Sequence, residues 1–203
     1  MDIKIGIDFD NTIINYDNVF HKYAVKYSFI PSEIKKNKKH IRNFIKKIKD
    51  GEKKWIELQA MVYGCFIDEA KPAEGINLFL DRCKETSIDV IIISHKTLYP
   101  SQGSRINLRD TAMKWLIKNG IISKSGLNEK DIIFSNTREE KLLKIKEQQC
   151  THFIDDMMEV LIEPNFPSDT IKILYSSEKE NNLPLEIIQL NNWYEIKEYF
   201  FKE

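Results

Sequence analysis

Short apolar runs and segments of helical periodicity alternate along this chain. Runs rich in Ile, Val and Phe predict buried β-strands, the first beginning at Lys4 and the others lying at about 89–94, 131–135, 152–156, 170–175 and 185–190. Between them, apolar residues recur every three or four positions, which predicts helices over about 15–30, 76–83, 108–118, 137–148 and 191–201. This alternation favours an α/β fold, with a parallel sheet covered by helices on both faces.

Residues 16–71 interrupt the alternation, because they carry helical patterns and no strand. Their middle part is rich in lysine, and one apolar helical face runs along it through Ile41, Phe44, Ile45 and Ile48. We expect Gly51 to end this helix and Trp55 to lie in the next one. Residues 16–71 are therefore predicted to form a small helical cap inserted after the first strand, and we call them the cap segment. Residues 1–15 and 72–203 would form the core.

Composition and charge narrow the range of partners. With 203 residues, 42% of them hydrophobic, the chain is long enough for one core domain with a modest insertion. Its 31 Lys+Arg are balanced by 31 Asp+Glu, so charge gives no reason to expect a nucleic acid polymer or a membrane as partner. A solvated face explains the lysine-rich helix better than a phosphate-bearing partner does. The sequence shows neither a leader nor an apolar membrane span, so we expect a cytoplasmic protein. Three widely spaced cysteines indicate no zinc site.

Polar residues stand where the predicted strands end. The first strand runs into Asp8, Asp10 and Thr12, the second ends at Ser94, and another ends at Asp155 and Asp156. The carboxyl ends of parallel strands meet at one edge of a sheet, so these side chains are expected to lie together. Carboxylates so close repel one another unless a hard divalent cation joins them. Taken alone, the segment 8–12 fits equally well a strand followed by an Asx-type turn.

A lysine completes this set from a neighbouring helix. Thr137 looks like a helix N-cap, and Glu140 three residues later would complete a capping box. Lys141 falls in the first turns of that helix, where it could reach the same edge of the sheet.

The four motifs at Asp8 to Thr12, Ser94, Lys141 and Asp155–Asp156 resemble, in order and context, those of the haloacid dehalogenase (HAD) superfamily of phosphohydrolases. The resemblance covers about residues 1–15 and 72–175 and implies a Rossmann-like core. It implies that Asp8 is the nucleophile, which takes the phosphoryl group as an aspartyl-phosphate. Asp10 would protonate the leaving group and then activate water, Ser94 would bind a phosphoryl oxygen, and Lys141 would neutralise charge.

The resemblance also implies Mg²⁺ as cofactor. The ion would lie between Asp8, the backbone carbonyl of Asp10 and the pair Asp155–Asp156, and the sequence leaves open which member of that pair binds it directly. An aspartate at position 10 favours hydrolysis of a phosphate ester over dehalogenation, because a halide leaving group needs no proton. A cap at residues 16–71 implies a small phosphorylated metabolite rather than a macromolecule as substrate.

Four residues after the second strand are candidates for substrate contacts. His95, Lys96, Arg105 and Arg109 could line the mouth of the pocket, where an arginine would suit a carboxylate or a second phosphate on the substrate. For each of the four, a surface charge or a loop-stabilising hydrogen bond is the favoured explanation.

The class of substrate stays open at this stage. Residues 94–115 and 137–160 also resemble a subgroup of these phosphatases encoded with bacterial surface-polysaccharide genes, which implies a sugar, amino-alcohol or polyol phosphate. One alternative is a 5'-nucleotidase, in which cap aromatics such as Tyr23, Tyr27 or Trp55 would stack on a base. The other is a binding module that keeps the fold without turnover. Nothing in the sequence indicates an oligomeric state.

Overall fold

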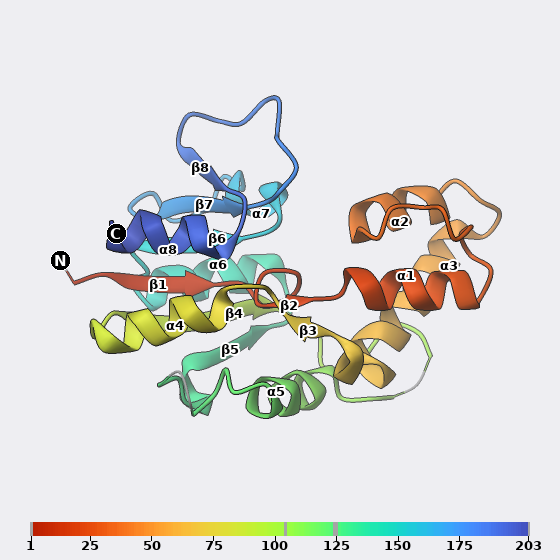
Figure 1. The fold of residues 1–203 in the computed structure, drawn as a ribbon, viewed down its shortest axis with the longest axis horizontal. Helices are drawn as coiled ribbons and strands as arrows, with labels where there is room; N and C mark the ends of the chain where they lie inside the picture. The colour runs from red at the N-terminus through yellow and green to blue at the C-terminus, as the bar shows by residue number, and fades with distance from the viewer. Residues whose placement is uncertain (1, 104, 124–125, 203) are drawn as a thin grey trace.

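A single parallel sheet forms the centre of the molecule. The computed structural model describes residues 2–103, 105–123 and 126–202. Its main sheet has six strands in the order β5-β4-β1-β6-β7-β8, and all neighbouring pairs are parallel. The strands are β1 (Lys4–Ile7), β4 (Asp89–His95), β5 (Ile132–Ser135), β6 (His152–Asp155), β7 (Ile171–Tyr175) and β8 (Ile187–Leu190). The predicted α/β fold with a parallel sheet is confirmed (Figure 1).

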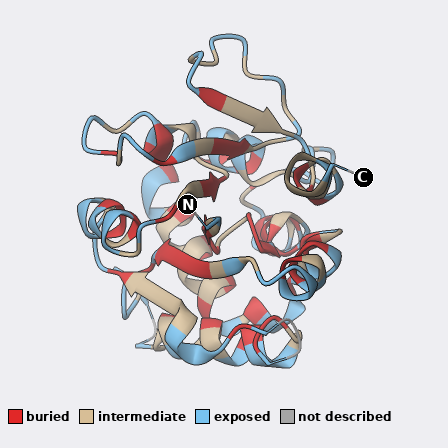
Figure 2. Cartoon of the chain, turned by 90° about the vertical axis from the view of Figure 1, so that its left-hand side faces the viewer, coloured by how far each residue is buried: buried red, intermediate tan, exposed pale blue. Residues whose placement is uncertain are grey.

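Helices cover both faces of this sheet. On one face α4 (Ile76–Glu85), α5 (Leu108–Lys118) and α8 (Trp193–Phe201) pack against the side chains of Ile5 and Ile7. On the other face α6 (Arg138–Glu147) and the short α7 (Met158–Leu161) pack in a second apolar cluster. Figure 2 shows buried residues concentrated on the strands and on the sheet-facing sides of the helices. A 3₁₀ turn, η3 (Glu129–Asp131), leads into β5.

β1 lies between β4 and β6, and this order places the acidic residues that follow the strands. Ile7 is in register with Ile92 of β4 and with Ile154 of β6. The residues that follow these positions, Asp8 and Asp155, therefore leave neighbouring strands at the same edge. Gly6 permits this packing, because a Cβ at that position would lie 2.5 Å from a ring carbon of Phe153.

The cap segment lies beyond the carboxyl ends of the strands. A two-stranded antiparallel sheet, β2 (Ile14–Asn15) and β3 (Lys71–Pro72), marks where the chain leaves and re-enters the core. Between them lie α1 (Asp17–Lys26), α2 (Lys38–Ile45), α3 (Gly51–Ala60), a π-helical turn η1 (Met61–Cys65) and a 3₁₀ turn η2 (Ile67–Glu69). Aromatic rings hold these helices together: Phe20 stacks on Trp55 at 5.1 Å and Tyr23 on Phe66 at 3.6 Å.

Two predicted helix ends were wrong. Gly51 begins α3 instead of ending α2, which already stops at Ile45. The chain reverses through Asp50, whose φ is 57°, and a Cβ on Gly51 would lie 2.1 Å from the Ile45 carbonyl oxygen. At the C-terminus the helix predicted over 191–201 begins only at Trp193. Asn192 caps it, because its side chain accepts hydrogen bonds from the backbone N–H groups of Tyr194 and Glu195. In the described residues, none of the helices is long and apolar enough to cross a membrane.

Candidate active site

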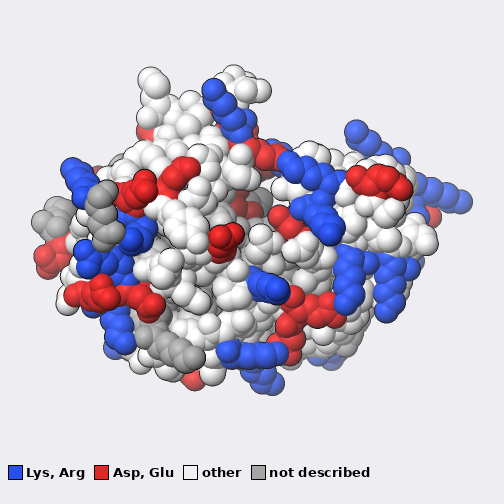
Figure 3. Space-filling view, in the orientation of Figure 1, with Lys and Arg blue, Asp and Glu red and all other residues white. Residues whose placement is uncertain are grey.

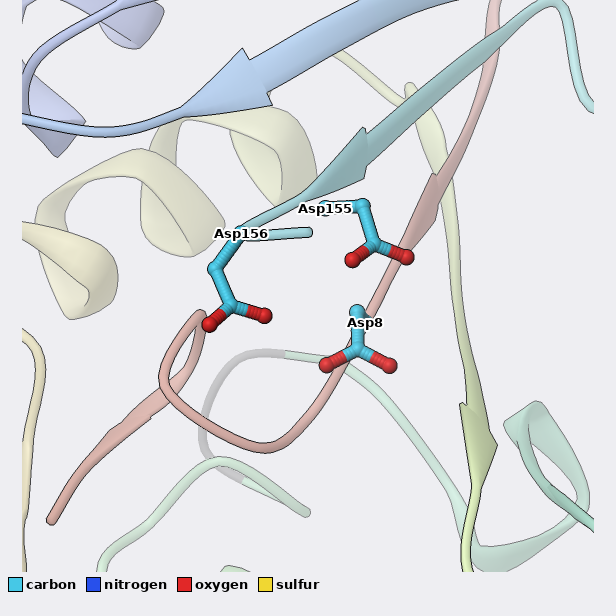
Figure 4. Close-up of side chains that lie close together, drawn as sticks. All are labelled: Asp8, Asp155 and Asp156. Atoms are coloured by element: carbon cyan, nitrogen blue, oxygen red, sulfur yellow. The ribbon is translucent and has the colours of Figure 1, made fainter. Parts of the chain in front are cut away.

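Three carboxylates converge at the carboxyl edge of the sheet. Asp8 follows β1, Asp155 ends β6, and Asp156 is the next residue. Figure 4 shows their side chains turned toward one another. One carboxylate oxygen from each residue lies within 4.8 Å of those from the other two. Asp8 and Asp155 are buried and Asp156 is half-buried. The sequence predicted this grouping from the strand ends, and the structure brings the three residues together.

Lys141 joins two of these carboxylates. Its Nζ lies 2.6 Å from Asp8 Oδ1 and 2.6 Å from Asp155 Oδ2, and the lysine is buried. Burial alone would lower the pKa of Lys141, but the negative charges of Asp155 and Asp8 raise it above its ordinary value. The ammonium is therefore fixed in its charged form next to the proposed nucleophile.

The start of α6 places this lysine. Thr137 caps the helix, its Oγ1 accepting a hydrogen bond from the backbone N–H of Glu140 at 3.1 Å. The Glu140 side chain does not complete the predicted capping box, since it accepts a hydrogen bond from the N–H of Asn136, one residue before the cap. Lys141 thus lies one turn into a helix whose N-terminus is fixed at the edge of the sheet.

The donor set of the acid cluster fits a hard divalent cation. Burial raises the pKa values of Asp155 and Asp156, and the neighbouring carboxylates add to the effect, although Lys141 opposes it at Asp155 and Lys38 opposes it at Asp156. Carboxylate oxygens are ligands that Mg²⁺ takes in proteins. The crowded negative charge gives such an ion a physical reason to bind.

Asp10 lies apart from the cluster and has different partners. Both of its carboxylate oxygens accept hydrogen bonds from Lys96 Nζ, at 3.0 and 2.9 Å, and Oδ1 also accepts one from the Tyr16 hydroxyl at 3.0 Å. Lys96 follows β4 and is only 3% exposed. Tyr16, at the start of the cap segment, is fully buried, and this burial together with Asp10 raises its pKa. Lys96 thus contacts a proposed catalytic group, whereas the sequence suggested substrate contact.

A cavity of about 420 Å³ opens over these residues and is lined by core and cap segment together. Ser94, His95 and Lys96 line it from the end of β4, as the sequence suggested. Figure 3 shows the hollow between the two parts of the molecule, with blue Lys and Arg side chains abundant over the cap segment at the right.

The two arginine candidates, Arg105 in the loop after β4 and Arg109 in the first turn of α5, do not line the cavity. Arg109 supports the site from outside: its Nε donates to the backbone carbonyl of Lys96 at 2.9 Å, and Nη2 donates to Asn136 Oδ1 at 2.8 Å. Arg105 is exposed, and its guanidinium lies 5.8 Å from the centre of the Tyr99 ring.

Sequence reasoning missed the contribution of α2. Lys38, its first residue, points its ammonium into the cavity, 5.6 Å from the centre of the Tyr63 ring. Burial would lower the pKa of Lys38, yet Tyr63, Asp156 and Asp10 raise it overall. The sequence analysis had grouped this residue with the solvated lysines. The four-residue spacing of Lys38, Arg42 and Lys46 is the signal that could have marked them as one helical face.

Ion pairs connect α2 and the residues just before it to the core. Lys35 Nζ lies 3.2 Å from Glu178 Oε1, Lys39 Nζ lies 3.3 Å from Glu180 Oε1, and His40 Nδ1 lies 3.5 Å from Glu178 Oε1. Both glutamates belong to the loop between β7 and β8. In this arrangement the cap segment rests on the core.

Comparison with known proteins supports the fold. No protein-family model and no curated protein sequence matches the chain. Among solved structures, a haloacid dehalogenase-like family hydrolase from Streptococcus pneumoniae is similar with a TM-score of 0.62 at 16% identity, over 98% of this chain and 98% of that one. A HAD-hydrolase from Bacillus subtilis, bound to magnesium, gives 0.61 at 11% identity, over 98% and 99% of the two chains. A phosphoserine phosphohydrolase-like protein from Francisella tularensis gives 0.54 at 11% identity, over 99% and 100%. The chain therefore has the fold of HAD-superfamily hydrolases.

Proposed function

We propose that this protein is a Mg²⁺-dependent phosphatase that hydrolyses a small phosphorylated metabolite through an aspartyl-phosphate on Asp8. The observation that carries the proposal is the buried contact of Lys141 with both Asp8 and Asp155, at 2.6 Å each, at the carboxyl edge of a HAD-like sheet. A nucleophilic carboxylate needs a nearby fixed cation, since its target is itself an anion. The names of similar structures, hydrolases and a phosphohydrolase-like protein, agree with this activity.

Two half-reactions follow from the residues at the site. In the first, a carboxylate oxygen of Asp8 forms a bond to phosphorus while the ester P–O bond breaks, and Asp10 gives a proton to the leaving alkoxide. In the second, Asp10 takes a proton from water, which attacks phosphorus and releases phosphate and free Asp8. Lys141 neutralises charge between Asp8 and the phosphoryl group, and Ser94, buried at the end of β4, donates a hydrogen bond to a phosphoryl oxygen.

The acid cluster would hold the metal. Asp8 and the pair Asp155–Asp156 supply carboxylate oxygens, and the backbone carbonyl of Asp10 is proposed as a further ligand. When bound, Mg²⁺ would supply Lewis-acid stabilisation of the negative charge on the phosphoryl oxygens. One structure with this fold, that of the Bacillus subtilis hydrolase, is described as bound to magnesium.

The cap segment limits the size of the substrate. It lines the same cavity of about 420 Å³ as Asp8, which is room for a small metabolite and excludes a macromolecule. A sugar, polyol or amino-alcohol phosphate of surface-polysaccharide synthesis is the class proposed from the sequence resemblance. For the nucleotidase alternative, Tyr23 stacks on Phe66 within the cap segment and does not line the cavity, whereas Trp55 stacks on Phe20 and also lines the cavity. The substrate panel below decides between the two classes.

Phosphate release from a panel of phosphate monoesters tests this proposal. Sugar, polyol, amino-alcohol and nucleoside monophosphates are each incubated with the purified protein, with Mg²⁺ or with a chelator. We expect release from at least one small ester that requires Mg²⁺, and a rapidly quenched reaction should yield a peptide phosphorylated on Asp8. Turnover that survives exhaustive chelation, or labelling at another residue, would refute the mechanism. If no phosphate were released from any ester of the panel, the proposed phosphatase activity would be refuted.

A further inference from the structure

One face of α2 is turned toward the proposed active site. Lys38 and Arg42 lie four residues apart on this helix, and Lys46 follows four residues later, directly after its end. Residues spaced by four lie above one another on a helix, so the three form one row. All three line the cavity that contains Asp8. The neighbouring row, Ile41 and Ile45, is fully buried in the apolar core and holds this orientation.

The three cations differ in how far their charge is already balanced. Lys38, at the inner end of the row, lies within the field of Asp156 and Asp10. Lys46, at the outer end, forms an ion pair of 2.9 Å with Glu52. For Arg42, between them, no residue in the described part of the chain provides an ion pair or a side-chain hydrogen bond. Arg42 lines the cavity as an exposed residue, and among the described residues no carboxylate pairs with it.

The carboxylates of the cavity gather at its inner end. Asp8, Asp155 and Asp156 form the proposed metal cluster, and Asp10 is held by Lys96, which also belongs to the core. The outer, cap-side end contains Arg42, Lys46 and a single acid, Glu52. The cations on α2 therefore form a positive region that is separate from the acid cluster at the proposed phosphoryl site.

We propose that the substrate carries a second anionic group besides the phosphoryl group that is removed, and that Arg42, aided by Lys46, binds it. This inference rests on the proposed phosphatase function and deepens it. The planar guanidinium presents paired N–H donors that match a carboxylate or a second phosphate. Both groups have this chemistry, and the experiment below distinguishes them.

The spacing along α2 also limits the length of the substrate. At 1.5 Å per residue, Arg42 lies about 6 Å along the helix beyond Lys38, whose ammonium is close to Asp10 and Asp156. A molecule with a few atoms between its two anionic ends spans the distance from the phosphoryl site to Arg42. Trp55 and Ile56 of α3 line the cavity as well and offer apolar surface to the part in between. Simple sugar, polyol and amino-alcohol monophosphates lack the second anion, so the inference narrows the substrate class proposed above to members that carry one.

Matched pairs of substrates test the inference by kinetics. 3-Phosphoglycerate and glycerol 3-phosphate differ in a carboxylate, and fructose 1,6-bisphosphate and fructose 6-phosphate differ in a second phosphate. With Mg²⁺ present, we expect the member with the second anion to have a kcat/KM about 10- to 100-fold higher than its partner in at least one pair. The pair that shows the preference identifies the second anion. Ethanolamine phosphate, which carries a cation instead, should be the poorest of the five.

A variant and a control assign that preference to its residue. Arg42→Gln should reduce the ratio of the two kcat/KM values to near unity, mostly by raising KM for the member with the second anion. Arg42→Lys should keep part of the preference. Lys47→Gln is the matched control, because Lys47 is an exposed lysine of the same region that does not line the cavity, and it should leave all rates unchanged. The inference would be overturned if the members without the second anion were hydrolysed equally well or better. It would also be overturned if Arg42→Gln lowered kcat/KM equally for both members of a pair.

Binding separates this inference from the proposed function. The five compounds are titrated calorimetrically into an Asp8→Asn variant with Mg²⁺, where no turnover is expected, with and without Arg42→Gln. If the compounds with a second anion bind more tightly, and this difference depends on Arg42, the inference is supported. This holds even if the wild-type protein has no phosphatase activity. Phosphatase activity without such a binding preference would overturn the second-anion site and leave the phosphatase standing.

Discussion

Asp8 and Asp10 are separated by one residue in the sequence, but their side chains have different partners. Asp8 contacts Lys141 and faces Asp155 and Asp156, whereas Asp10 is hydrogen-bonded to Lys96 and Tyr16. The first environment suits a carboxylate that must attack while negative charge builds up around it. The second holds a carboxylate in the same cavity but apart from the acid cluster, which fits the proposed role of proton donor to the leaving group.

At the scale of single residues, we predict that Asp8→Asn lowers kcat by at least about a thousandfold, because it removes the nucleophile while changing the shape very little. Thermal unfolding should show that the variant still folds. Asp81→Asn, an exposed aspartate on α4, is the control and should be fully active. If Asp8→Asn kept a tenth of the wild-type turnover, direct attack by water would replace the aspartyl-phosphate mechanism.

We also predict that the effect of Asp10→Asn depends on the leaving group. With an alkyl phosphate the loss should be about 10²–10⁴-fold, the usual contribution of a general acid. With p-nitrophenyl phosphate, whose leaving group hardly needs a proton, the rate of Asp8 phosphorylation should fall much less. Single-turnover kinetics measures this step directly. The same loss for both esters would contradict the acid role and leave Asp10 with a positioning role only.

At the scale of elements, α2 faces the cavity with one row of residues and contacts the core with another. The ion pairs of Lys35 and Lys39 with Glu178 and Glu180 join the cap segment to the loop between β7 and β8. Exposed pairs contribute about 0.2–1 kcal/mol each, so together they can shift the balance between a closed and an open cap several-fold without locking it. Such weak contacts suit a lid that opens in each cycle.

We therefore predict that the double variant Glu178→Gln, Glu180→Gln lowers kcat/KM for the natural substrate about two- to tenfold. The wild-type value should fall with increasing NaCl, because these pairs are exposed and screened, and the variant should depend less on salt. Glu147→Gln is the control, because it removes an exposed ion pair with Lys144 on α6, outside the cap segment. It should change neither kcat/KM nor its dependence on salt. An unaltered kcat/KM in the double variant would show that these pairs do not hold the cap.

At the scale of the whole molecule, the balanced charge conceals an uneven distribution. The cap segment contains 13 Lys+Arg and 7 Asp+Glu, so the core carries the compensating negative excess. A basic cap over an acidic edge of the sheet attracts both an anionic substrate and a cation for the carboxylates. In the core one lysine, Lys141, faces the three carboxylates of the cluster, so we expect the stability of the protein to depend on a cation bound there.

We predict that Mg²⁺ raises the melting temperature of the metal-free protein. A ligand that binds only the folded state at a hundred times its dissociation constant adds about 2.7 kcal/mol of stability. Differential scanning calorimetry over a Mg²⁺ titration measures this shift, and Asp156→Asn should reduce it by removing one ligand. Glu163→Gln, which alters an acid paired with Arg138 outside the cluster, serves as control. A melting temperature indifferent to saturating Mg²⁺ would argue against the metal site.

The sequence by itself determined the sheet and the group of residues at its edge. Asp8, Ser94 and Asp155 could be placed because each follows or ends an apolar run, and parallel strands present their carboxyl ends at one edge. Lys141 could be placed because Thr137 marks the helix start just before it. Both inferences need only local pattern and a general rule of topology. The roles of these residues in catalysis stay predictions until the variants above are measured.

Only the tertiary structure decided which charged residues face the cavity. Lys38 and Arg42 look like other lysines and arginines of a solvated helix, and their orientation depends on how α2 packs on α1 and α3 through Ile41 and Ile45. Likewise Lys96 pairs with Asp10, while Arg105, in the loop that follows, points to solvent. A long side chain on an exposed helix or loop has no local pattern to fix its direction. That direction is set by contacts between segments distant in the chain.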